Sequence, residues 1–100
     1  MAFLCFGGVA APCAVSDSLA EAREAYARRM DPAQARRALT LYDEAERADP
    51  GSCDALWEGA RAYYFVGTCP RPRLSEEERR RLFAEGLRKA RAAVAALPGN

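Results

Sequence analysis

Apolar residues recur at every third or fourth position through most of this chain, and this spacing places them on one face of a helix. Four amphipathic helices are predicted, over residues 19–30, 32–48, 53–66 and 76–96. The apolar stripe of the first comprises Leu19, Ala22, Tyr26 and Met30, and that of the second comprises Ala35, Ala38, Leu41 or Tyr42, and Ala45. The pattern therefore predicts an all-α fold.

Turn and cap residues separate these segments. Residues 31–32 (Asp-Pro) end the first helix and begin the second, since proline is favoured at the first helical position. Residues 49–52 (DPGS) form a turn, and Gly67 is predicted to cap the third helix at its C-terminus. Ser75 and Glu78 have the spacing of a capping box, so the fourth helix is predicted to begin there.

The N-terminal run over residues 2–15 (AFLCFGGVAAPCAV) contains no charged residue. It is too short to span a bilayer, which takes about 20 residues, but its length and small-residue end are typical of a secretion signal. No basic residue precedes it, so a buried N-terminal segment or a frayed tail stays open as the alternative. We separate residues 1–16, a signal-peptide remnant, from a helical domain over residues 17–100.

Small residues stand at matching distances before two proline turns. Ala45 and Ala93 lie five residues before Pro50 and Pro98, respectively. With Pro50 as a closing proline, the chain resembles the tetratricopeptide repeat, a helix pair of about 34 residues. The resemblance implies a short α-solenoid with repeats over about 19–52 and 53–100 and an insert over 68–81. The repeat core it implies comprises Tyr42, Ala45, Leu56, Ala60, Tyr63, Gly86, Ala90 and Ala93.

A more specific resemblance rests on LW…ARAYYFVG, followed by an insert with EEER…LFAEGLRKA and a closing proline. This combination is similar to the periplasmic T component of TRAP-type transport systems. That family implies a periplasmic location, a lipid anchor as the only membrane contact, and binding of a small ligand or a protein partner. Pro12 directly before Cys13 fits a lipidation site poorly. A cytoplasmic adaptor that binds a partner peptide is the alternative.

Composition and charge narrow the function classes. Alanine, arginine and glutamate are plentiful and isoleucine is absent, as in helical proteins. The chain has no histidine, the commonest general base and metal ligand, so we predict no catalytic centre, cofactor or metal. The net charge of +1 predicts no nucleic-acid partner, although residues 71–91 carry eight basic and four acidic residues. Cys53 and Cys69, at opposite ends of the third helix, are too far apart for a disulfide.

The candidate binding residues come from the repeat register. The resemblance places Asp54, Trp57, Arg61 and Tyr64 on the groove side of the third helix, with Arg23 at a corresponding place on the first. A charge pair would then flank an aromatic stacking surface suited to a peptide or small ligand. The alternative is that Trp57 and Tyr64 are simply core residues.

A second apolar stripe follows the fourth helix. Phe83, Leu87, Val94 and Leu97 repeat at helical spacing on a face that would meet a further repeat in a longer array. We predict that this stripe is exposed in the monomer, or is covered by residues 2–15 or by a second chain. Self-association through the last helix is the corresponding partner prediction.

Overall fold

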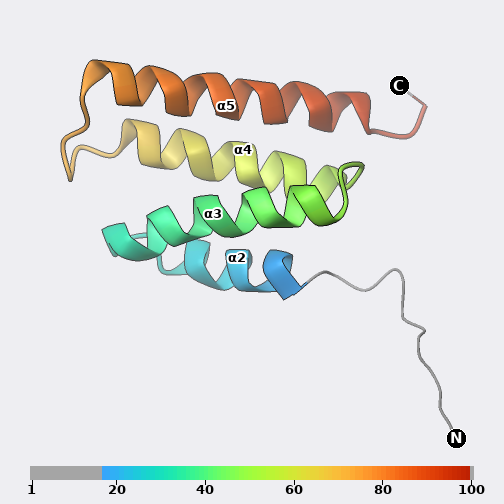
Figure 1. Ribbon diagram of the computed structural model, residues 1–100, viewed down its shortest axis with the longest axis horizontal. Coiled ribbons are helices and arrows are strands. Elements are labelled where there is room, and N and C mark those ends of the chain that lie inside the picture. The colour runs from blue at the N-terminus through green and yellow to red at the C-terminus, as the bar shows by residue number, and fades with distance from the viewer. Residues whose placement is uncertain (1–16, 100) are drawn as a thin grey trace, which may run out of the picture.

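A computed structural model of the chain describes residues 17–99, and this part is all-helical. It contains α2 (Asp17–Ala27), α3 (Pro32–Ala48), α4 (Cys53–Thr68) and α5 (Glu76–Ala95). The helices lie side by side in chain order, each running opposite to the one before it (Figure 1). The predicted signal remnant, residues 1–16, falls outside the described residues.

Local cap chemistry explains where three of these helices begin. Asp31 accepts a hydrogen bond from the Ala33 amide at 3.0 Å, next to a proline at the first turn of α3. Ser52 and Ser75 accept from amides in the first turns of α4 and α5, at 3.1 and 3.0 Å. These bonds satisfy amides that have no partner within the helix. The predicted starts at Pro32, Cys53 and Glu76 are confirmed.

Two predicted helix features are wrong. The first helix ends at Ala27, and Met30 lies in the following turn with 85% of its surface exposed. The chain has to leave the helix there because Asp31 caps α3 from an extended conformation. Gly67 does not cap α4, which continues to Thr68 and is capped by Cys69. Pro70 explains the later end, because a proline disfavours helical geometry in the residue before it.

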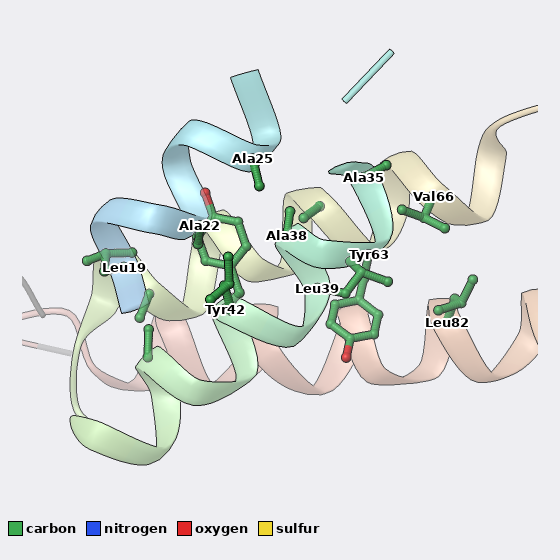
Figure 2. Packing of buried hydrophobic residues seen from close by; sticks show 14 of the residues in the cluster. Leu19, Ala22, Ala25, Ala35, Ala38, Leu39, Tyr42, Tyr63, Val66 and Leu82 are labelled. Atoms are coloured by element: carbon green, nitrogen blue, oxygen red, sulfur yellow. The ribbon is translucent and has the colours of Figure 1, made fainter. Parts of the chain in front are cut away.

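The core is formed mainly by alanine, leucine and tyrosine side chains, and every described helix contributes to it (Figure 2). The predicted stripe of α3 is confirmed, with both Leu41 and Tyr42 buried. Of the predicted repeat core, Tyr42, Ala45, Leu56, Tyr63, Gly86 and Ala93 are buried. Ala60 and Ala90 are half-buried, since they lie at the edge of the α4–α5 contact.

Glycines allow α4 and α5 to approach closely. A Cβ atom at Gly86 would lie 3.3 Å from the Cβ atom of Tyr63. A Cβ atom at Gly67 would lie only 2.6 Å from Cε1 of Phe83, closer than non-bonded carbons pack. Gly67 is therefore explained by the passage of the Phe83 ring across α4 and not by the turn that was predicted there.

Candidate functional site

Four of the five predicted groove residues lie together on the surface between α2 and α4. Arg23 of α2 reaches across to α4, with its Nη2 atom 3.6 Å from a carboxylate oxygen of Asp54. The Trp57 indole donates a hydrogen bond to Asp54 at 3.3 Å. The Arg61 guanidinium lies 5.0 Å from the centre of the Trp57 ring. We call Arg23, Asp54, Trp57 and Arg61 the α2–α4 face.

Aromatic rings extend this face toward the far end of α2. The Arg61 guanidinium also lies 4.3 Å from the centre of the Tyr26 ring, and Arg29 lies 4.4 Å from the same ring. Tyr26 meets Phe65 edge to face at 6.1 Å. Both guanidinium groups restrain the Tyr26 ring, because cations are attracted to the faces of aromatic rings. The sequence pattern placed Tyr26 in the core and did not reveal this role.

Trp57 is neither buried nor fully exposed. Its exposed fraction is 43%, so a large part of the residue remains open to solvent. Tyr64, the fifth predicted groove residue, is 64% exposed and leans toward α5, with its ring 5.8 Å from that of Phe83. Tyr64 therefore lines a different hollow of about 500 Å³ between α4 and α5, which Phe83 and Leu87 also line.

A buried carboxylate supports the α2–α4 face from beneath. Glu58 is 6% exposed and accepts hydrogen bonds from Nε and Nη2 of Arg23 at 2.9 and 2.8 Å. The Tyr42 hydroxyl donates to the same carboxylate at 3.1 Å. Three helices thus meet at Glu58, and the two-pronged bond holds the Arg23 guanidinium in one orientation.

The pKa values of Tyr42 and Arg23 are both raised, that of Tyr42 by burial and by its contact with Glu58, and that of Arg23 by its contact with Glu58. The hydrogen bond to Glu58 raises the pKa of Arg23 above its ordinary value. Burial, followed by the nearby Glu58 carboxylate, raises the pKa of Tyr42 to about 12. Both shifts favour the charge states that keep the Glu58 bonds intact at neutral pH.

Lys89 anchors a second network, between α3 and α5. Its side chain is fully buried, and its Nζ atom lies 2.6 Å from Glu46 and 2.9 Å from Asp43. Asp43 Oδ1 has no hydrogen bond, so the charge of Lys89 compensates its burial. The Tyr63 hydroxyl donates to the other Asp43 oxygen at 2.7 Å. The hydroxyls of Tyr42 and Tyr63 point in opposite directions, each into its own network (Figure 2).

Sequence reasoning missed Glu58 and Lys89, although a signal for each was present. Glu58 stands three residues after Ala55 and four before Ala62, within a buried stripe. Lys89 stands three residues after Gly86 and four before Ala93, and it is the chain's single lysine. A charged residue inside an apolar stripe indicates a paired buried charge.

The apolar stripe of α5 lies largely on the surface of the described structure. Leu87, Val94 and Leu97 are between 47% and 54% exposed, and Phe83 is half-buried beside Gly67. Exposure of this stripe was one of the predicted arrangements. Whether a second chain covers it stays a prediction.

Other chemistry within residues 17–99 is sparse. Cys53 and Cys69 are free thiols at opposite ends of α4, and Cys5 and Cys13 fall outside the described residues. In this part of the chain no cluster of histidine, cysteine or carboxylate side chains could hold a metal ion. No helix among the described residues is long and apolar enough to cross a membrane.

Comparison with known proteins adds no family to these observations. No family model matches the chain, and no curated protein or solved structure matches it either. The tetratricopeptide and T-component resemblances therefore remain proposals that rest on the residues themselves.

Proposed function

We propose that the chain is a non-enzymatic, tetratricopeptide-like binding module that holds an extended segment of a protein partner on its α2–α4 face. The observation that carries the proposal is the half-exposed Trp57, bracketed by Arg61 and by the Arg23–Asp54 pair. Tryptophan, tyrosine and arginine are the residues that contribute most binding energy at protein interfaces.

The charges on this face suit a peptide with both polar and aromatic or aliphatic side chains. Arg23 and Asp54 are 41% and 64% exposed at the side chain, so their mutual attraction contributes at most about 1 kcal/mol. A partner's charges can replace that weak contact at little cost. Glu58 meanwhile holds Arg23 in place, so less side-chain entropy is lost when a partner binds.

The resemblance to the tetratricopeptide repeat supports the α2–α4 face as the binding surface. In tetratricopeptide folds the first helix of each pair lines a concave groove, and the register makes α2 and α4 those helices. We extend the proposal to an exported, periplasmic component of the T-component type, whose ligand is a protein partner or a small molecule. The cytoplasmic adaptor that binds a partner peptide remains the alternative, and the two share the α2–α4 face as the binding surface.

Peptide display tests the binding surface directly. Peptides selected on the wild-type chain should bind at least tenfold more weakly to Trp57→Ala and Arg61→Ala, measured by fluorescence anisotropy. Arg91→Ala, an exposed arginine on α5, is the matched control and should bind within twofold of wild type. Peptides whose binding survives Trp57→Ala but is lost on changing Leu87 would place the binding surface on α5 and contradict the proposal.

Stability measurements distinguish a binding role from a core role. Trp57→Ala should leave a cooperatively folded protein, since the side chain is 43% exposed. Tyr63→Ala should cost about 3–5 kcal/mol, because it empties a buried site and breaks the bond to Asp43. Equal loss of stability in the two variants would mean that Trp57 is a core residue.

A further inference from the structure

A separate cavity of about 410 Å³ lies at the end of the molecule where the α2–α3 turn meets the α4–α5 loop. In Figure 1 this is the left end, where the chain leaves α4 and enters α5. Its floor and walls are apolar and come from Met30, Pro32, Phe65, Val66, Pro70 and Leu74. None of the four residues of the α2–α4 face lines it, although Arg29 and Phe65, which contact Tyr26 at the end of that face, do.

Three arginines and no acidic side chain line this cavity, which we call the arginine pocket. Arg29 is held in place by the Tyr26 ring and by a bond to the Tyr26 carbonyl at 3.1 Å. Arg36 pairs with Glu78, outside the pocket, at 3.1 Å and with both side chains partly exposed. Arg71 makes no ion pair within residues 17–99 and is exposed at the mouth.

We propose that the arginine pocket binds a small amphipathic carboxylate, of the class represented by medium-chain fatty acids. The volume lies in the range of small-molecule sites, which are mostly apolar with a few charged groups that orient the ligand. The hydrocarbon part of the ligand lies against Met30, Phe65 and Leu74. Its carboxylate meets Arg71, whose planar guanidinium can donate two parallel hydrogen bonds.

Charge selects this ligand class over the alternatives. A neutral apolar ligand would leave the Arg71 guanidinium without a partner at the mouth, and a cation would be repelled by three guanidinium groups. The surrounding loop adds Arg73, so the charge around the opening is of one sign over residues 69–74. Arg36 can turn from Glu78 to the ligand at small cost, because the pair between them is partly exposed.

Calorimetric titration of the full chain with decanoate, decanol and decyltrimethylammonium tests the proposal, with the two ions below their critical micelle concentrations and decanol below its solubility limit. Decanoate should bind saturably and at least tenfold more tightly than decanol, and the cation should show no saturable binding. Arg71→Gln should weaken decanoate binding at least tenfold, because it removes the positive charge that strengthens both bonds to the carboxylate. Arg91→Gln, outside the pocket, is the matched control and should bind decanoate like wild type.

A second pair of variants locates the site without disturbing the fold. Met30→Glu and Leu97→Glu introduce the same charge at exposed positions, one in the arginine pocket and one at the far end of α5. Only Met30→Glu should weaken decanoate binding. Bound decanoate should also slow the alkylation of Cys69, which lines the pocket, and should leave Cys53 unaffected, as mass spectrometry of the labelled peptides would show.

Several results would overturn the proposal. These are the absence of saturable decanoate binding, equal affinity for decanoate and decanol, or equal effects of Met30→Glu and Leu97→Glu. Conversion of a wild-type dimer into a monomer by Met30→Glu would show that the cavity is instead covered by a second copy. None of these outcomes bears on peptide binding at Trp57, so the two proposals can fail separately.

Discussion

At the scale of single residues, two buried charges determine how the helices are tied together. Glu58 joins α2, α3 and α4 through Arg23 and Tyr42. Lys89 joins α3 and α5 beside the Tyr63 ring, whose centre lies 5.5 Å from the ammonium group. Such groups cost free energy to bury, and the cost is offset only while every partner is present.

Replacing Lys89 with methionine should show this dependence. Lys89→Met keeps the length of the buried stem and removes the charge that faces Asp43 and Glu46. The expected loss is about 3 kcal/mol in the free energy of unfolding, measured by urea denaturation, because Asp43 loses its counter-ion and Glu46 keeps only Arg88. Arg91→Met, exposed on the same helix, should stay within about 0.5 kcal/mol of wild type. Equal stability of the two variants would mean that Lys89 contributes only packing.

Glu46 should make stability depend on acid pH. The hydrogen bond from Arg88, reinforced by Lys89 against the effect of burial, lowers the pKa of Glu46 from 4.5 to about 2. Because the folded pKa lies below the unfolded one, this stabilisation is complete above pH 4.5 and is lost as the pH falls toward about 2.

The Glu46→Gln variant isolates this contribution. It should be about 1–3 kcal/mol less stable than wild type at pH 7, where two charge-assisted bonds are weakened. The difference between the two urea curves should shrink between pH 4.5 and about 2. Glu24→Gln, exposed on α2, serves as the control and should match wild type at pH 7. A difference that stays constant down to pH 2 would contradict the lowered pKa.

At the scale of elements, packing between α4 and α5 explains a glycine that local rules misplace. Alanine is favoured over glycine inside a helix by about 1 kcal/mol. Gly67 nevertheless lies within α4, where the Phe83 ring leaves no room for a Cβ atom. The steric cost of overpacking, about 1–3 kcal/mol, exceeds the gain in helix propensity.

The sign of a Gly67→Ala substitution should therefore depend on Phe83. In the wild-type background Gly67→Ala should lower the melting temperature, by the equivalent of about 1–2 kcal/mol. In a Phe83→Ala background, which removes the ring, the same change should stabilise by up to about 1 kcal/mol. A stabilising effect in both backgrounds would show that the ring moves aside freely. Melting curves of the four proteins in this cycle decide between the two.

The helices could be predicted because their signals are local, and the site could be predicted only in part. Apolar spacing, Pro32 and the cap residues Ser52 and Ser75 fix three helix starts within a few residues of sequence. The predicted apolar stripe was wrong at Met30. The chain leaves the helix before this residue so that Asp31 can cap α3, although the apolar spacing continues to Met30. Tyr42 and Arg23 lie 16 and 35 residues from Glu58, and Glu46 and Asp43 lie 43 and 46 residues from Lys89, so no local pattern specifies these pairs. The pocket likewise combines residues from two stretches, 29–36 and 65–74, that are distant in sequence.

At the scale of the whole molecule, the apolar stripe of α5 is left exposed by the helices of the described structure. Leu87 and Leu97 are 52% and 47% exposed, and Leu87 also lines the hollow of about 500 Å³ between α4 and α5. Helical repeat arrays normally end in a helix with a polar outer face. The outer face of α5 instead presents Leu87 and Val94, with Leu97 just beyond the end of the helix, and exposed apolar side chains of this kind favour contact with another helix.

Self-association through this stripe should be measurable and sensitive to one side chain. The wild-type chain is predicted to dimerise in a concentration-dependent manner in sedimentation experiments. Leu87→Glu should weaken the dimer about 100-fold, because a leucine buried in each of two copies contributes about 1.5 kcal/mol or more per copy. Met30→Glu, the same kind of change at an exposed site on another face, should leave the dimer intact. A wild-type chain that stays monomeric at high micromolar concentration would show that the α5 stripe tolerates water.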